Sequence, residues 1–364
     1  PLMYPPDWPL ALIAKVIPLP DLTWLLLYFA LGAWFLFLLA REWGARPEGA
    51  LLGAAALVFA PNLVAVGSHG HGSQLVNSAY VPLMLWLATR WMRNGDLRDL
   101  GWLALAGGFQ MLRGHVQICF YTWLAVGLYA VIEWLAGLRR PGELAPRTGR
   151  ALGVMLAAAL AFGIAGVYNL SLRDYAQWSI RGGGVGGGVG MSYATQWSLA
   201  PYELPSIVVP GYVGFGGQTY WGGMPFTDYP NAYVGMVAIV LAVPAFLANG
   251  AARVFALALA VVSLAIAFGS NSPVYGLLYA HLPLFNKFRI PVMIILLFQV
   301  AAALATAWGW SSVLDRAAHK PAKGKASTLL GRMLVGMGAI LVLALVVGVF
   351  GQAGWRDGYV RGAI

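Results

Sequence analysis

The chain has 364 residues, of which 60% are hydrophobic and 10% are charged, with a formal net charge of +10. Soluble proteins carry about 25% charged residues, so this composition excludes a soluble enzyme and predicts a polytopic helical membrane protein. The basic residues fall in short clusters between apolar runs rather than along an aromatic-rich groove, which excludes a nucleic-acid-binding protein. The single cysteine, Cys119, excludes an internal disulfide and is expected to be a small buried hydrophobe.

The apolar runs predict an all-α bundle of about ten membrane spans, because about 20 apolar residues cross the hydrocarbon. In chain order the expected spans are 21–40, 49–67, 78–94, a short run near 100–112, 116–137, 151–170, 232–249, 254–270, 290–310 and 333–351. The positive-inside rule places the basic clusters between the spans on the cytoplasmic face. This requires 99–138 to form a hairpin that turns near Arg113.

The other face then collects most of the remaining polar segments. We interpret residues 1–20 as the end of an outer-face loop and 171–231 as a long outer-face loop. The ranges 21–170 and 232–364 contain the transmembrane helices, and the second range ends in an outer tail. Because the first span runs inward, we expect Pro1 to lie outside and at least one span to precede it.

The 171–231 loop divides into a flexible start and an aromatic remainder. The glycine-rich stretch 181–190 predicts a hinge, since glycine packs little and has high backbone entropy. The following residues 191–231, which include Trp221, are rich in aromatic residues, proline and glycine and predict ordered turns and short helices rather than a sheet. A hinge followed by such a segment is typical of a lid over a cavity.

The stretch "GSHGHGSQ" at 67–74 places His69, His71 and Gln74 between two apolar runs. Its glycines would let backbone N–H groups approach an anion, so contact with a substrate or phosphate is one interpretation. Metal ligation, which needs a third ligand, and an ordinary polar loop are the alternatives.

The turn "QMLRGHVQ" at 110–117 is the stronger signal, because it puts Arg113, His115 and Gln117 between apolar helices. An ionisable residue at membrane depth favours a functional role, and arginine with imidazole and amide donors suits a phosphate. The alternative is an arginine that extends to the interface.

Two acids are candidates for catalysis. Asp174, next to Arg173, ends an apolar run, and Glu203 lies in the aromatic loop. Asp174 or Glu203 could act as a general acid or base, or could form a structural ion pair. The sequence identifies no cofactor, and a requirement for a divalent metal ion is left as an alternative.

The segment "LPLFNKFRIP" carries Lys287 and Arg289 on the expected outer face, against the charge bias. A basic pair there indicates an anionic partner such as a lipid phosphate. We expect Arg113, His115, Arg289 and the His69 loop to converge on one outer-leaflet cavity. Asp174 or Glu203 would pair with Arg113 there when no ligand is bound.

Several motifs together resemble one family. "GHGSQ", "RGHVQICFY", "SLAPYELPSIVVPGYVG", "YWGGMPF" and "LPLFNKFRIP", spread over about residues 20 to 300, resemble the YfhO-type bacterial membrane proteins. These are similar to the GT-C superfamily of membrane glycosyltransferases. The resemblance implies a bacterial cytoplasmic-membrane enzyme that moves a sugar from a polyprenyl-phosphate donor to an extracytoplasmic cell-envelope glycan or polymer. In that family a catalytic acid lies in the first outer loop, a stretch that would precede Pro1.

Two functions therefore remain. The first is this glycosyltransferase, in which the His69 loop, Arg113, His115, Gln117, Arg173, Trp221, Lys287 and Arg289 would bind substrate. The second is a transporter or a non-catalytic membrane subunit that binds a lipid or an envelope polymer. Transporters usually place ionisable residues near mid-membrane in paired broken helices, often with internal repeats. This sequence shows no convincing repeat and its polar groups gather at one face, so the enzyme is favoured.

Overall fold

A computed structural model describes residues 4–20, 22–176, 178–179, 189–214, 216–224, 232–245 and 250–318. These residues form fifteen α-helices and five 3-10 helices, and no strand occurs among them. The prediction of an all-α fold is therefore confirmed for the described part of the chain.

Four helical segments within the described ranges are long and apolar enough to cross a membrane, and a bent pair would make a fifth. This indicates a multi-pass membrane protein. The four are α2 (Thr23–Glu42), α7 (Val116–Gly137), α8 (Leu144–Ile164) and Pro291–Arg316, which joins η5 (Pro291–Ile294) to α15 (Ile295–Ala318). The count of ten spans stays a prediction, and the expected last span, 333–351, lies outside the described residues.

The expected span 49–67 is not one straight helix. It is divided into α3 (Pro47–Val58) and α4 (Pro61–Ser68), which are bent by 49° relative to each other. Pro61 explains the break, because proline has no N–H to donate to the preceding turn and its ring clashes with that turn. Pro61 stands instead at the start of α4, where its fixed φ suits a new helix.

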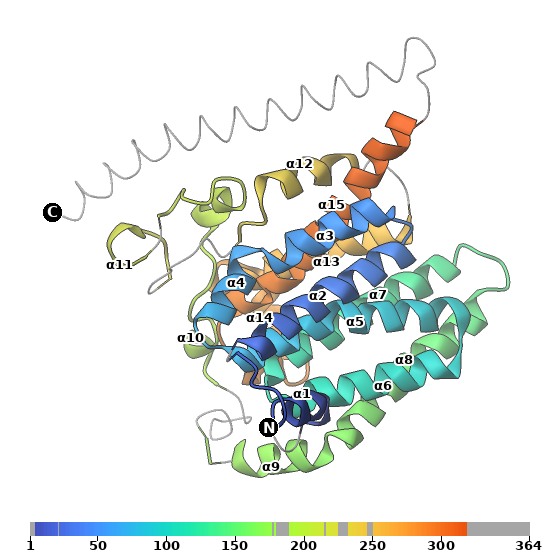
Figure 1. The fold of residues 1–364 in the computed structure, drawn as a ribbon, viewed down its shortest axis with the longest axis horizontal. Helices are drawn as coiled ribbons and strands as arrows, with labels where there is room; N and C mark the ends of the chain where they lie inside the picture. The colour runs from blue at the N-terminus through green and yellow to red at the C-terminus, as the bar shows by residue number, and fades with distance from the viewer. Residues whose placement is uncertain are drawn as a thin grey trace.

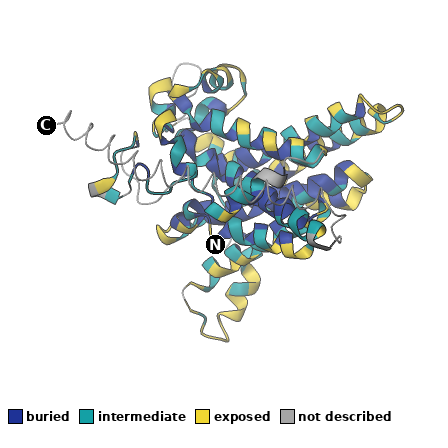
Figure 2. Cartoon of the chain, turned by 90° about the horizontal axis from the view of Figure 1, so that it is seen from above, coloured by how far each residue is buried: buried dark blue, intermediate teal, exposed yellow. Residues whose placement is uncertain are grey.

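Helix α5 (Gly72–Asn94) lies in the middle of the bundle and is buried over most of its length. It packs against α2, α7 and α6 (Leu97–Leu112), and α6 packs in turn against α8. Figure 1 shows this succession of helices, with α3, α15 and α13 (Ala251–Ala267) on the far side of α2. Figure 2 shows the buried residues along these central helices and exposed residues on the outer helices and tips.

Helix α3 approaches α15 closely through two glycines four residues apart. A Cβ on Gly49 would lie 2.3 Å from the carbonyl oxygen of Ala307, and one on Gly53 would lie 2.5 Å from that of Ala303. Small residues at this spacing let two membrane helices bring their backbones together. Another helix, α12 (Met236–Ala245), covers α15 on a further side.

The connecting segments at one end of the bundle are built from short elements. They are η1 (Pro5–Asp7), α1 (Trp8–Ile13), α9 (Gly166–Ala176), α10 (Met191–Ala194), η2 (Pro201–Ile207), α11 (Gly216–Thr219), η3 (Gly269–Asn271), α14 (Pro273–His281) and η4 (Phe285–Lys287). Residues 191–224 therefore contain short helices and turns, as expected, where they are described. Most of the predicted hinge, residues 181–188 of 181–190, lies outside the described residues.

The basic clusters meet at the opposite end, which we call the basic end. There Arg93 pairs with Glu42 at 3.0 Å, Arg150 donates to the carbonyl oxygen of Arg93 at 2.9 Å, and Arg46 pairs with Asp315 at 3.2 Å. Helices α6 and α7 form the expected hairpin, with Arg113 in the turn between them and the basic cluster after α7 at its other end. The charge pattern thus predicted correctly which helix ends lie together.

Candidate functional site: the Arg113 cluster

An ion pair between Asp7 and Arg113 is the centre of the candidate site. Arg113 Nη1 donates to Asp7 Oδ2 at 2.8 Å, and the hydroxyl of Tyr28 donates to Asp7 Oδ1 at 2.6 Å. The Arg113 guanidinium lies 5.1 Å from the centre of the Tyr4 ring, and the hydroxyls of Tyr4 and Tyr80 lie 2.6 Å apart. The two charged side chains are 20% and 23% exposed, whereas the three tyrosines are buried. The Asp7–Arg113 ion pair is therefore largely shielded from solvent, but enough of it is exposed for a ligand to reach it.

The geometry of the turn between α6 and α7 positions the Arg113 side chain in this cluster. Arg113 is the C-cap of α6, and Gly114 reverses the chain with a φ of +83°, which L-residues rarely adopt. His115 is the N-cap of α7, and its ring accepts a hydrogen bond from the Ile118 N–H at 3.3 Å. Asp7 ends the 3-10 turn that begins after Tyr4. Two tight turns, 106 residues apart in sequence, thus bring a cation and an anion together.

The expectation that Asp174 or Glu203 would pair with Arg113 is wrong, because Asp7 takes that place. The N-terminal segment folds back over the α6–α7 turn and supplies a carboxylate within hydrogen-bonding distance. The Nε–H of Arg113 is buried and has no acceptor among the described residues. A buried donor left without an acceptor costs about 1–3 kcal/mol, so this atom suits a ligand oxygen.

Gln117 and Arg289 come together beside this turn through the backbone of Arg289. The Gln117 side-chain amide donates to the carbonyl oxygen of Arg289 at 2.7 Å and to the Tyr121 hydroxyl at 2.9 Å. The Arg289 guanidinium donates to the Tyr193 hydroxyl at 2.8 Å and lies 5.1 Å from that ring. Lys287 is partly buried in η4, two residues earlier.

The His69 loop connects α4 to α5 at the same end of the bundle. His69 and His71 are exposed, and Gln74 is buried. His69 Nδ1 lies 2.8 Å from the carbonyl oxygen of Ala65, which fixes the ring against its own helix. A Cβ on Gly72 would meet the Trp24 ring at 2.6 Å, so the loop packs on the first turn of α2. Within the described residues, no three His, Cys, Asp or Glu side chains gather as a metal site would require.

Glu203 organises the aromatic loop. It is buried, and its Oε1 accepts hydrogen bonds from the Gly223 N–H at 2.6 Å and the Tyr220 hydroxyl at 3.2 Å. Burial raises the pKa of the Glu203 carboxyl, and these two donors partly oppose that shift. The Trp221 ring stacks on Tyr202, with 5.9 Å between ring centres. Of the predicted site residues, Glu203 thus holds the loop together by hydrogen bonds and Trp221 does so by ring stacking.

The remaining two candidates, Arg173 and Asp174, lie on α9 and are exposed. Figure 1 shows α9 at the edge of the bundle. They stand apart from the contacts that join Asp7 to Arg113.

An apolar groove begins at the Arg113 cluster. This cavity of about 400 Å³ runs between α5 and α6, from Tyr80 to the Arg90–Asp99 ion pair. Tyr80, Leu83 and Leu87 line it from α5, and Trp102, Leu105, Ala106 and Phe109 line it from α6. From Tyr80 to Arg90 the groove follows ten residues of helix, or about 15 Å. Its shape and lining suit a hydrocarbon chain.

Comparison with known proteins finds no protein-family model and no curated protein that matches the chain. The chemistry of the site is therefore inferred from its own geometry.

Four residues of the cluster were missed by sequence reasoning: Tyr4, Asp7, Tyr28 and Tyr80. Asp7 is one of the few acids in segments expected on the outer face, and that scarcity was the signal that could have identified it. Tyr28 and Tyr80 lie inside apolar helices, where nothing in the local pattern distinguishes them from aromatic core residues, and Tyr4 stands in a short proline-rich stretch with no motif around it.

Proposed function

We propose that the chain is an integral-membrane glycosyltransferase that takes a sugar from a polyprenyl-phosphate donor and transfers it to an extracytoplasmic acceptor. The observation that carries this proposal is the Asp7–Arg113 ion pair at 2.8 Å, placed where the apolar α5–α6 groove begins. A carboxylate, a guanidinium and a channel for hydrocarbon are what such a reaction needs at one place. The resemblance of several motifs to YfhO-type proteins supports the same conclusion.

The donor would bind with its hydrocarbon chain in the groove and its phosphate at Arg113. Guanidinium groups bind phosphate through two parallel hydrogen bonds, and the Arg113 Nε–H and one Nη offer such a pair. Binding would exchange one partner of Arg113 for another, since the phosphate oxygens would take the place of Asp7. That exchange frees the Asp7 carboxylate while Tyr28 still donates to it.

The freed carboxylate would then act as general base. The acceptor hydroxyl gives its proton to Asp7 as its oxygen forms a bond to the anomeric carbon of the sugar. The bond between that carbon and the phosphate oxygen breaks, and the electron pair leaves with the polyprenyl phosphate. Arg113 faces the negative charge that develops on this leaving group, which is where a fixed cation lowers the barrier most.

The test uses purified full-length protein in lipid nanodiscs with a polyprenyl-phosphate sugar, following both donor binding and release of polyprenyl phosphate. Arg113→Ala should weaken donor binding by about 2–5 kcal/mol, the range for losing one partner of a buried charge pair. Arg113→Lys should recover only part of this, because an ammonium cannot make the paired contact. Asp7→Asn should retain donor binding and lose turnover.

Asp174→Asn is the matched control, because it makes the same change at an exposed acid on α9. Equal losses in Asp7→Asn and Asp174→Asn would reject Asp7 as the base. Donor binding that needs Arg113, without turnover in the parent protein, would favour the alternative of a non-catalytic subunit or transporter that binds a lipid or an envelope polymer.

A further inference from the structure

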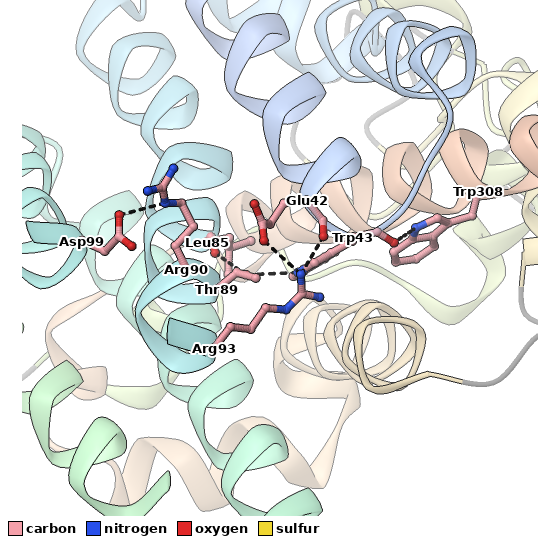
Figure 3. A network of polar contacts seen from close by, with 8 residues as sticks. All are labelled: Glu42, Trp43, Leu85, Thr89, Arg90, Arg93, Asp99 and Trp308. Carbon is pink, nitrogen blue, oxygen red and sulfur yellow. Dashed lines mark hydrogen bonds and ion pairs between the residues drawn. The ribbon is translucent and has the colours of Figure 1, made fainter. Parts of the chain in front are cut away.

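The α5–α6 groove has a second charged end, opposite the Arg113 cluster. There the Arg90 Nε–H donates to Asp99 Oδ1 at 2.8 Å, and both residues line the groove. Figure 3 shows this ion pair, with the two terminal nitrogens of the Arg90 guanidinium pointing away from Asp99. Arg90 lies about one turn before Arg93 on α5, so this end of the groove is at the basic end of the bundle.

Both members of this ion pair keep groups that can bind a ligand. The Asp99 side chain is 5% exposed, and its Oδ2 is buried and accepts no hydrogen bond from any residue that the structure describes. The contact from Arg90, which is 39% exposed, uses Nε and leaves both Nη groups available. A buried acceptor without a donor costs about 1–3 kcal/mol, and more when it is charged. This end of the groove therefore suits a ligand that offers N–H donors to Asp99 and an acceptor to Arg90.

The charges of the pair indicate which kind of ligand fits. Arg90 and Asp99 have opposite charges that cancel, so the pair has no excess charge to favour a simple anion or a simple cation. A zwitterion satisfies both residues at once when its ammonium reaches Asp99 and its phosphate reaches Arg90. The four groups then alternate in sign around a ring, and each contact is a charge-assisted hydrogen bond. A quaternary ammonium cannot complete this ring, because it has no N–H to donate.

The surroundings of the pair are those of a lipid headgroup. The Arg90 guanidinium lies 5.2 Å from the centre of the Trp86 ring, and Trp102 also lines the groove, one turn after Asp99. Tryptophan side chains concentrate at the depth of the headgroups. Beyond them the lining is apolar for about 15 Å, which is half of the roughly 30 Å hydrocarbon core and the depth that one leaflet contributes.

We propose that this end of the groove binds phosphatidylethanolamine from the leaflet at the basic end, with one acyl chain lying in the groove. The primary ammonium of the headgroup donates to Asp99 Oδ2, and the phosphodiester accepts from the Arg90 Nη groups. This headgroup has N–H donors, a phosphate and no net charge, as the pair requires. The site does not depend on the proposed function, because it involves neither the Arg113 cluster nor a polyprenyl donor.

The first test varies the headgroup and leaves the protein unchanged. The full chain in phosphatidylcholine nanodiscs is titrated with phosphatidylethanolamine, with its N-methyl and N,N-dimethyl forms, or with phosphatidylglycerol, all with the same acyl chains. Retained lipid is counted by native mass spectrometry, and the melting temperature is followed. Phosphatidylethanolamine should bind saturably and raise the melting temperature most, and its affinity should decrease as methyl groups replace N–H donors.

Two results of this titration would overturn the site. They are phosphatidylglycerol binding as tightly as phosphatidylethanolamine, and phosphatidylethanolamine showing no advantage over the phosphatidylcholine around it. Glycerophosphoethanolamine has the same headgroup and no acyl chains. An equal rise in melting temperature with that compound would reject the lipid as the source of the headgroup.

The second test changes the pair itself. Asp99→Asn should lower the affinity for phosphatidylethanolamine about tenfold, or about 1.4 kcal/mol, because the ammonium loses a charged acceptor. It should also raise the affinity for phosphatidylglycerol, since Arg90 is then no longer paired with a carboxylate. Arg90→Gln should lower the affinity for phosphatidylethanolamine about fivefold, or about 1 kcal/mol, as expected for a basic residue near the headgroups.

Arg98→Gln is the matched control for Arg90→Gln. Arg98 precedes Asp99 on α6 and is exposed, and it is outside the lining of the groove. This variant should bind phosphatidylethanolamine as the parent does. Equal losses in Arg90→Gln and Arg98→Gln, or unchanged phosphatidylethanolamine binding in Asp99→Asn, would contradict the proposal.

Discussion

Replacing Gly53 by alanine tests the close approach of α3 and α15. The added Cβ would lie 2.5 Å from the Ala303 carbonyl oxygen and 2.9 Å from the Ala307 Cβ, whereas ordinary contacts begin at 3.4 Å. The obstacle is the backbone of α15, which cannot rotate away, so the two helices must separate by roughly 0.9 Å, the difference between 3.4 and 2.5 Å.

Overpacking of this kind costs about 1–3 kcal/mol, and alanine regains up to about 1 kcal/mol of helix propensity. Subtracting the propensity gain leaves an expected net loss for Gly53→Ala of up to about 2 kcal/mol. Gly127→Ala is the matched control, because Gly127 lies in α7 with nothing within 4 Å of its added Cβ. That change should be neutral or stabilising by up to about 1 kcal/mol.

The measurement is reversible unfolding in mixed micelles of a mild detergent and dodecyl sulfate, with the midpoint compared across the three proteins. The midpoint of Gly53→Ala should lie below those of the parent and of Gly127→Ala. A Gly53→Ala protein at least as stable as Gly127→Ala would refute the helix separation described for α3 and α15.

Two further predictions concern the segments beside the candidate site. Glu203→Gln keeps an oxygen that accepts from Gly223 and Tyr220 but cannot ionise. Because burial raises the Glu203 pKa, the folded loop holds a proton that the unfolded chain releases, so loop stability falls as pH rises above the ordinary value of 4.5 toward the raised pKa. Hydrogen exchange of 201–224, corrected for intrinsic rates, should show this loss in the parent and not in Glu203→Gln. Gln117→Leu removes the hydrogen bond to the Arg289 carbonyl and should destabilise the protein by about 1–3 kcal/mol, with faster exchange at residues 288–290; unchanged exchange there would contradict the role given to Gln117.

The helical class and the common location of the basic clusters could be predicted from the sequence, because hydropathy and charge bias act locally along the chain. The hairpin turn at Arg113 followed from the same two rules. Pro61 shows where those rules fail, since an unbroken apolar run hides a bend that a single proline imposes. Pro61 marks the break in the sequence, but a hydropathy profile over 49–67 does not register it.

The partner of Arg113 could not be predicted in the same way. Asp7 and Arg113 are separated by 106 residues, and their contact depends on how the N-terminal segment packs over α2 and the α6–α7 turn. Glu203 illustrates the same limit, because the donors that hold it, Tyr220 and Gly223, come from a later turn of the loop. Side-chain pairing across a fold is set by tertiary packing, which local patterns do not contain.

The buried position of α5 has a consequence for how the chain enters the membrane during synthesis. Although α5 has 23 residues, it is less apolar than the helices that could cross a membrane unaided. Helices that follow it in the chain satisfy part of its polar groups: the Asn77 backbone carbonyl oxygen accepts from Gln110 of α6 at 3.0 Å, and the Asn77 side-chain oxygen accepts from Cys119 of α7 at 3.0 Å. Helices α6 and α7 leave the ribosome after α5, so α5 cannot complete these contacts when it first emerges. Its stable insertion therefore depends on segments that follow it, and α5, α6 and α7 assemble as a group rather than one at a time.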